Sequence, residues 1–352
     1  MARPAYRLTG IILAILAILL PPPAVANPVL VGYFPAFKGL ERQLETTSIV
    51  HYTHINIAFA NPDAGARMVH GESMACMADG AGGQVSLAAL RTAAARLRAE
   101  GARVLLSVAG GVIPACAGDW RVLLAPAGRD GVVRELLAVT EAAGLDGIDV
   151  DIEGELLTAI DRDANYTPFI AALSRELRAR GRLLTVATAS YEGGMVPVAS
   201  VPYFDLVMPM SYDAIGPTWG QAGSEHATRE QAARDVALWL SRGVPRERLV
   251  LGVPFYGYGF GGHAPNHDFR ALRAAHGAVT TTSDVIGAAC AGCDYITFNS
   301  QATIRWKAEL AAARAGGVMV WEMTQDTADQ LLASTIAAAL GLTSPELTTH
   351  GE

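Results

Sequence analysis

Eight short runs of apolar, often β-branched residues recur along the chain, and a segment with helical periodicity follows most of them. In one such segment Leu87, Leu90, Ala94 and Leu97 share a helix face. Strands with nearly continuous hydrophobicity suit a parallel sheet that is covered by helices. We therefore expect an α/β fold, a single-domain (β/α)8 TIM barrel. The eight expected strands are 29–34, 53–59, 104–108, 147–153, 183–189, 206–212, 249–255 and 318–321.

The same alternation also occurs in doubly wound open sheets, which usually carry a glycine-rich phosphate turn after the first strand. Residues Gly32-Tyr33-Phe34-Pro35 are not such a turn. Pro209 is unusual for a central strand, because proline lacks a backbone donor. Thr228 and Ser300 are expected to cap the N-termini of two helices.

The N-terminal segment has the pattern of a secretory signal peptide. Arg3 and Arg7 precede an apolar stretch, three prolines and Ala24-Val25-Ala26, which is typical of a cleavage site. The stretch is shorter than the roughly 20 residues that span a bilayer, although an uncleaved anchor is the alternative. We expect a signal peptide over 1–26, a barrel over 27–342, a polar tail over 343–352 and a secreted or periplasmic protein.

The charge balance limits the class of partner. Charged residues make up 17% of the chain and the formal net charge is −7, so there is no basic surplus to neutralise phosphates. We expect no nucleic-acid partner, no membrane contact after signal cleavage, and a monomer.

The four cysteines are Cys76, Cys116, Cys290 and Cys293. In an exported chain they are expected to form disulfides, for which three pairings exist. Cys290 and Cys293 could close a short loop, which would leave Cys76 with Cys116. A zinc site is the alternative, but the first pair lacks CxxC spacing and no close histidine completes the ligand set.

The most informative segment is 145–153, Leu-Asp-Gly-Ile-Asp-Val-Asp-Ile-Glu. Side chains alternate along a strand, so Asp149, Asp151 and Glu153 share one face, which points into a barrel. Three confined carboxyl groups cannot all ionise, so at least one should hold a proton near neutral pH and serve as a general acid. Glu153 lies at the C-terminal end of the strand, where barrel active sites are built. We assign Glu153 as the acid and Asp151 as its partner.

Two other interpretations of this strand are open. It could be an edge strand with a solvated acidic face, although it stands in the middle of the eight runs. It could also bind a cation, since Asp149-x-Asp151-x-Glu153-Gly154 resembles the start of an EF-hand loop. The twelfth position is Ile160 instead of the required glutamate, however.

The segment Asp146-Gly147-Ile148-Asp149-Val150-Asp151-Ile152-Glu153 matches the DGxDxDxE signature of glycoside hydrolase family 18, the chitinase-like family. The resemblance extends over roughly 29–326. It is carried further by Gly32-Tyr33, Ala58-Phe59, Met210-Ser211-Tyr212-Asp213, Pro254-Phe255-Tyr256-Gly257 and Gly316-Gly317-Val318-Met319-Val320-Trp321.

The resemblance implies a barrel that cleaves β-1,4 bonds of chitin or chitooligosaccharides with retention, in which the substrate's acetamido group attacks the anomeric carbon. It implies that Glu153 protonates the leaving oxygen, that Asp151 holds the acetamido group, that Asp149 tunes the charge of Asp151, and that Tyr212 hydrogen-bonds the acetamido carbonyl. The other substrate-binding positions that it implies are Asp213, Trp321, Met210, Tyr33 and Phe59. No cofactor and no metal are expected.

We expect an endo-acting chitinase. The alternatives are an endo-β-N-acetylglucosaminidase that acts on glycoprotein glycans and a non-catalytic chitin-binding barrel. Two departures from the family pattern stand out: Ala109 replaces the first glycine of SxGG, and the segment between the seventh and eighth strands is too short for a full-length α+β insertion, which predicts a shallow cleft. Trp120 and Trp219 could stack on further sugars or be partly buried loop aromatics.

Overall fold

The computed structural model describes residues 27–80 and 82–342. The expected signal peptide and the expected polar tail lie outside the described residues. Among the residues described, no helix is both long and apolar enough to cross a membrane.

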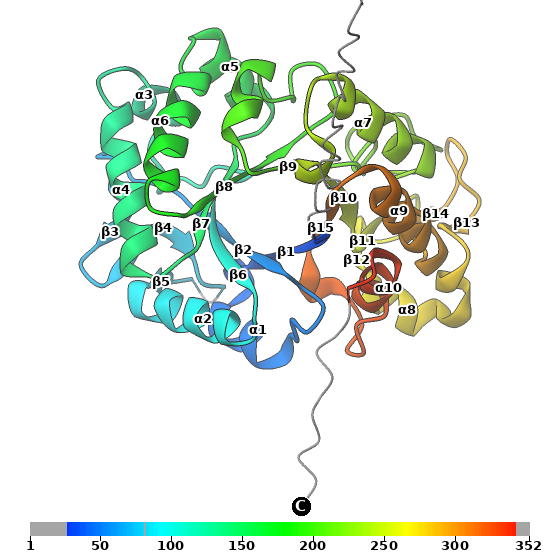
Figure 1. The fold of residues 1–352 in the computed structure, drawn as a ribbon. Helices are drawn as coiled ribbons and strands as arrows, with labels where there is room; N and C mark the ends of the chain where they lie inside the picture. Colours follow the sequence, from blue (N-terminus) through cyan, green and yellow to red (C-terminus); the bar gives the residue numbers. More distant parts are fainter. Residues whose placement is uncertain (1–26, 81, 343–352) are drawn as a thin grey trace, which may run out of the picture.

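Eight parallel strands form one sheet in the order β10-β15-β1-β2-β6-β7-β8-β9. An isolated parallel bridge between Val207 and Leu249 joins the two end strands, so the sheet curls into a barrel that helices surround (Figure 1). The predicted TIM barrel is confirmed. Its strands are β1 (Val29–Pro35), β2 (His54–Ala60), β6 (Arg103–Ala109), β7 (Gly147–Asp151), β8 (Leu183–Thr188), β9 (Leu206–Pro209), β10 (Val250–Pro254) and β15 (Gly317–Trp321).

Two strands end at least two residues earlier than the sequence predicted. β7 ends at Asp151 instead of Glu153, and β9 ends at Pro209 instead of Tyr212. The position of Pro209 explains how proline is tolerated: it is the last residue of β9, beside the seam where a single bridge joins β9 and β10.

Helices cover the outer face of the barrel, and the side chains of Thr228 and Ser300 cap α7 and α9 as predicted. The helices are α1 (Leu40–Thr46), α2 (Leu87–Ala99), α3 (Trp120–Leu123), α4 (Arg129–Ala142), α5 (Gly154–Arg162), α6 (Tyr166–Arg178), α7 (Arg229–Ser241), α8 (Phe269–His276), α9 (Gln301–Arg314) and α10 (Leu331–Leu340). Short 3-10 turns occur at η1 (Ala36–Lys38), η2 (Val198–Tyr203), η3 (Arg246–Arg248), η4 (Gly277–Thr281) and η5 (Met323–Gln325).

Alternation along β7 separates two apolar layers. Ile148, Val150 and Ile152 belong to the large cluster between the strands and the helices, whereas Asp149 and Asp151 are buried on the opposite, inner side. A smaller apolar cluster, which includes Val31, Tyr33, Met208 and Met319, fills the barrel interior. The strand is central and its acidic face is buried, so the edge-strand alternative is wrong.

Two small antiparallel sheets project from the barrel. β3 (Val69–His70), β4 (Ser73–Ala78) and β5 (Gln84–Ser86) form one sheet between β2 and α2. The other follows β10 and has the order β12-β11-β14-β13, with α8 between its second and third strands in the chain. Its strands are β11 (Tyr256–Phe260), β12 (Asn266–Asp268), β13 (Val285–Gly287) and β14 (Tyr295–Phe298).

This compact α+β unit lies beside the barrel near α7 and α9 (Figure 1). The sequence predicted no full-length insertion here, and it did not predict the small sheet that forms. Its strands are short, and β11 alternates aromatic residues with glycine, so neither a long apolar run nor a strong strand pattern marks it.

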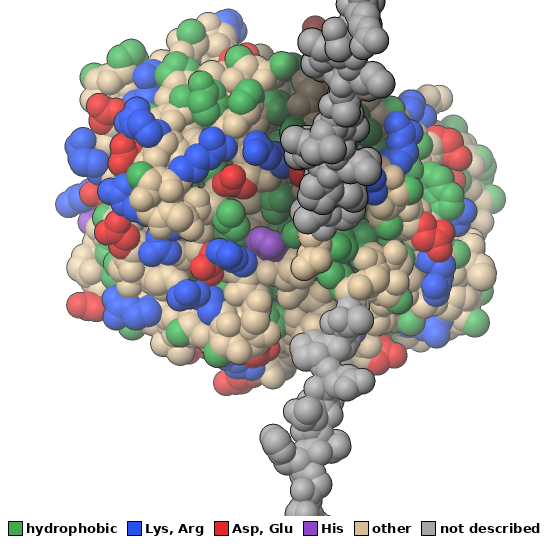
Figure 2. All heavy atoms as spheres, in the orientation of Figure 1, with side chains coloured by type: hydrophobic (Ala, Val, Ile, Leu, Met, Phe, Trp, Pro, Cys, Tyr) green, Lys and Arg blue, Asp and Glu red, His purple; other side chains and the backbone are tan. Residues whose placement is uncertain are grey.

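Disulfides join Cys76 to Cys116 and Cys290 to Cys293. The disulfide prediction is confirmed, and because all four cysteines are paired, the zinc alternative is wrong. On the face drawn in Figure 2, basic and acidic side chains are interspersed over the surface of the helices.

Candidate active site

Asp149 forms the floor of the site, inside the barrel and closed off from solvent. Its carboxylate accepts hydrogen bonds from Tyr33 Oη (2.7 Å), Ser107 Oγ (2.7 Å) and Thr185 Oγ1 (2.6 Å). Ser107 and Thr185 stand directly opposite Asp149 on the neighbouring strands β6 and β8. Burial raises the pKa of Asp149, while these three hydrogen bonds stabilise the ionised form and act in the opposite direction.

Asp151 lies one step nearer the mouth and has fewer partners. It is buried, and its Oδ1 atom has no hydrogen-bond partner among the described residues. Burial, then the nearby Glu153, then Asp149 raise the pKa of Asp151 well above its usual range. An acceptor that is buried without a donor is costly, so this oxygen is a place where a bound molecule could contribute a hydrogen bond.

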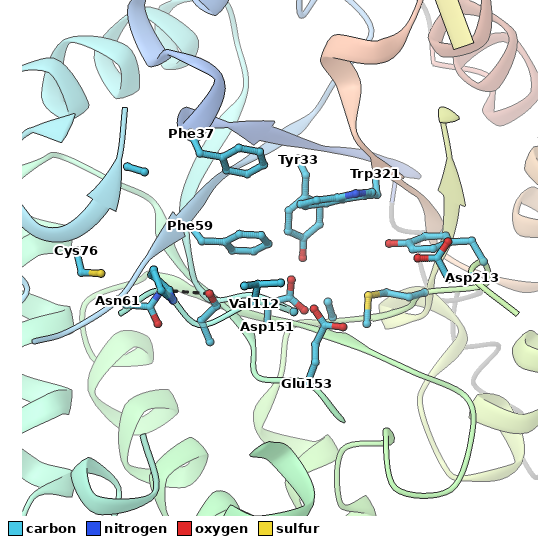
Figure 3. Close-up of a pocket in the computed structure, with 17 residues that line it drawn as sticks. Tyr33, Phe37, Phe59, Asn61, Cys76, Val112, Asp151, Glu153, Asp213 and Trp321 are labelled. Atoms are coloured by element: carbon cyan, nitrogen blue, oxygen red, sulfur yellow. Dashed lines mark hydrogen bonds between the residues drawn. The ribbon is translucent and has the colours of Figure 1, made fainter. Parts of the chain in front are cut away.

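Glu153 follows the end of β7 and immediately precedes α5, yet its backbone is still extended, with φ −119° and ψ 164°. The strand alternation therefore continues for one more step, and the side chain points into the same pocket as Asp151 (Figure 3). Burial and the charge of Asp213 raise the pKa of Glu153 to about 7, while Asp151 opposes that rise. A carboxyl group with this pKa is divided between acid and base near neutral pH and can serve as either.

The pocket around these groups has a volume of about 490 Å³. Aromatic rings form one wall: Phe59 stacks on Trp321 with ring centroids 5.5 Å apart, and Tyr33 meets Trp321 edge-on at 5.4 Å (Figure 3). Phe37, from the turn after β1, extends this wall. An apolar wall facing carboxyl groups suits a sugar, which has an apolar ring face and a polar rim.

Tyr212 and Asp213 lie in the loop that follows β9 and also line the pocket. Asp213 adopts a left-handed conformation with φ 58°, and its Oδ1 accepts a hydrogen bond of 2.5 Å from Tyr256 Oη on β11. The small α+β unit thus supports a residue of the pocket.

The structure brings together all the residues that the sequence predicted for the site. Asp149 lies beneath the pocket, and the others line it: Tyr33, Phe59, Asp151, Glu153, Met210, Tyr212, Asp213 and Trp321. Sequence reasoning missed Ser107 and Thr185 as partners of Asp149. Both are polar residues inside expected apolar strands, and this pattern could have indicated hydrogen-bond partners for a buried carboxyl group.

Ala109, which departs from the family glycine, takes the left-handed conformation with φ 76° and lines the pocket. This conformation favours glycine, so alanine is strained there. Gly111 lies further along the same loop, where a Cβ would stand 3.0 Å from Glu153 Oε1, and glycine leaves room beside that carboxyl group.

The two loop tryptophans, Trp120 and Trp219, differ in how exposed they are to solvent. Trp120 is buried and donates from Nε1 to Asn61 Oδ1 at 2.8 Å, so it is not a stacking surface for sugars. Asn61 in turn donates to the carbonyl of Ala109 (Figure 3). Trp219 is 46% exposed and donates to the backbone carbonyl of Asp213.

Comparison with known proteins places the same residues in a known family. Residues 29–326 match the model of the glycosyl hydrolases family 18. The chain belongs to this family. Chitinase 63 of Streptomyces plicatus is 26% identical to it over 236 residues, which are 55% of this chain and 38% of that protein. The chain therefore spans well under half the length of this curated relative.

Solved structures show the same family barrel. The GH18 chitinase ChiB from the chitin utilization locus of Flavobacterium johnsoniae superposes with a TM-score of 0.74 at 28% identity, covering 89% of this chain and 94% of that one. A mutant of the class V chitinase from Nicotiana tobaccum, solved in complex with NAG4, has a TM-score of 0.72 at 21% identity. It covers 90% of this chain and 99% of that one and shares the fold.

Proposed function

We propose that the protein is an exported, retaining chitinase that cleaves β-1,4 bonds of chitin or chitooligosaccharides, with Glu153 as its general acid. The observation that carries this proposal is the row of three carboxyl groups, Asp149, Asp151 and Glu153, that leads from the interior of a family 18 barrel to its mouth. Its outermost member, Glu153, has a pKa raised to about 7 and opens into the aromatic-walled pocket. The names of the relatives support the choice of substrate.

In the first step Glu153 donates its proton to the glycosidic oxygen as the bond to the anomeric carbon breaks. The substrate's acetamido carbonyl oxygen forms the new bond to that carbon, which gives an oxazolinium ion and needs no carboxylate nucleophile. Asp151 lies beside Glu153 and would accept the acetamido N–H at its unpaired Oδ1. The ionised Glu153 then takes a proton from the water that opens the oxazolinium ring, which restores the acid.

Other groups would hold the sugar. Trp321 and Phe59 offer a flat apolar surface for its ring, and Tyr212 would donate to the acetamido carbonyl. Asp213 would accept from a hydroxyl group of the same sugar. Asp149, held by three hydroxyl donors, would keep a negative charge beneath Asp151.

The test compares wild type with Glu153→Gln on chitin oligosaccharides and on a high-mannose glycoprotein. We expect hydrolysis of the oligosaccharides by wild type, β-anomeric products by NMR, and at least a thousandfold loss in the variant. Because the acid must be protonated, kcat/KM should fall above pH 7. Equal activity in the variant would remove Glu153 from the role. Cleavage of the glycoprotein alone would favour the endo-β-N-acetylglucosaminidase, and binding without cleavage would favour the chitin-binding barrel.

A further inference from the structure

A histidine that the mechanism does not use lies behind the pocket. The His226 side chain is completely buried, and neither ring nitrogen has a hydrogen-bond partner of normal geometry among the described residues. Its Nδ1 atom faces Asp213 Oδ1 at 3.5 Å. A buried imidazole that forgoes hydrogen bonds is costly.

The surroundings of the ring leave it little freedom. Its ring centroid lies 5.3 Å from that of Tyr256 and 5.2 Å from that of Tyr258, both on β11. The charged groups that act on it are Asp213 from the loop after β9, Lys307 from α9, and Asp284 just before β13. Burial lowers the pKa of His226, while the neighbouring Asp213 carboxylate acts in the opposite direction.

The backbone at this point is also anchored from outside the loop. His226 N donates to Thr297 Oγ1 on β14, and the His226 carbonyl accepts from Ala214 N, next to Asp213. The next carbonyl, that of Ala227, accepts from Lys307 Nζ at 3.0 Å and from Asn299 Nδ2 at 2.7 Å. The α+β unit and α9 therefore fix the position of the ring relative to the barrel.

These contacts converge on one oxygen of Asp213. Tyr256 Oη and His226 Nδ1 both lie against Oδ1, while the Asp213 side chain also lines the pocket. We propose that His226 is a positioning residue: its Nδ1–H holds Asp213 Oδ1 from behind, so that Oδ2 is presented to the sugar. This proposal rests on the proposed function, because it gives Asp213 a substrate to contact.

The first experiment needs no activity. Ring ¹⁵N resonances of His226 are assigned in the full-length protein by their loss in His226→Phe and then compared between wild type and Asp213→Asn. We expect the Nδ1 resonance to move when the carboxylate becomes an amide, while the rings of His51 and His276 stay unchanged. An unchanged His226 spectrum would overturn the contact whether or not the protein cleaves chitin.

The second experiment measures kinetics on chitooligosaccharides. His226→Phe keeps a ring between Tyr256 and Tyr258 but removes the donor, and we expect kcat/KM to fall about tenfold, mainly through KM. The charge of Asp213 raises the pKa of Glu153, so a change in the distance between these two carboxyl groups should also shift the basic limb of the pH profile. His226→Gln, which retains a donor, should recover most of the loss, and His276→Phe on α8 is the matched control.

A purely structural role would lower Tm and the amount of active enzyme, but it would leave KM and the pH limb unchanged. If His226→Phe keeps the wild-type KM and pH profile, the positioning role is wrong. If wild type itself does not cleave chitooligosaccharides, the proposed function fails, and the NMR comparison still decides whether His226 contacts Asp213.

Discussion

Replacing the proposed acid Glu153 with glutamine should stabilise the folded protein at alkaline pH while it removes activity. The folded state raises the pKa of this carboxyl group from 4.5 to about 7, chiefly by burial. Between these values the folded protein binds more protons at this site than the unfolded chain does. The contribution of Glu153 to the free energy of unfolding therefore falls as pH rises from 4.5 to 7 and is then constant, because the folded site must hold a charge that it disfavours.

The magnitude follows from the shift. One pKa unit corresponds to about 1.4 kcal/mol, so ionised Glu153 costs the folded state about 3 kcal/mol above pH 7. Glutamine has a similar shape and no charge, so it avoids this cost. For a barrel of roughly 300 residues, 3 kcal/mol corresponds to about 5 °C in Tm. We expect Glu153→Gln to melt about 5 °C above wild type at pH 8 and within about 1 °C of it at pH 4.5.

Calorimetry of both proteins at the two pH values measures this difference directly. Glu155→Gln is the matched control, since Glu155 is exposed on the first turn of α5 and its replacement should change Tm little at either pH. A Tm difference that is the same at pH 4.5 and pH 8 would refute the reasoning, and so would a variant that is less stable than wild type at pH 8.

Three further changes test the frame around the site. Tyr33→Phe removes one hydrogen bond to Asp149 and should lower the free energy of unfolding by about 2 kcal/mol in urea titration; an unchanged midpoint would contradict the hydrogen bond. Ala109→Gly relieves a left-handed alanine and should raise stability by about 0.5–1 kcal/mol, so a lower Tm would show that the conformation is not strained. The double change Cys76→Ser with Cys116→Ser opens a link across 40 residues and should cost about 4 kcal/mol; a reductant should lower the Tm of wild type more than that of this variant, which keeps the short Cys290–Cys293 loop.

The barrel was predictable because its strands are buried on both faces and leave long apolar runs. All eight runs became strands of one sheet. The acidic face of β7 was predictable from alternation alone, because a two-residue period places Asp149 and Asp151 on one side whatever the neighbouring strands are. The family resemblance of the motif around Tyr212 and of the segment that ends at Trp321 then predicted further residues that line the pocket.

The features that could not be predicted from the sequence depend on contacts between segments that are distant in the chain. Ser107 and Thr185 became partners of Asp149 through strand register, which a single strand does not encode. The small sheet after β10 escaped prediction because its strands are short and rich in glycine. His226 belongs to no motif, and it meets Asp213 only because the loop after β9 folds back against β11 and β14.

The carboxyl groups of Asp149, Asp151 and Glu153 differ in how many hydrogen-bond donors the protein supplies to them, and their positions on β7 and beyond its end explain the difference. Asp149 lies where β6 and β8 run in register beside it, so both neighbours supply donors. Asp151 is the last residue of the strand and keeps an unpaired oxygen. Glu153 lies past the strand end, where the ladder supplies no partner and only the cavity remains. Regular pairing thus supplies hydrogen-bond donors at the floor, and the end of the strand at the mouth leaves an unpaired acceptor on Asp151 and a titrating carboxyl group on Glu153 for a substrate to contact. Any substitution that extended regular pairing past Asp151 should therefore add stability and remove function.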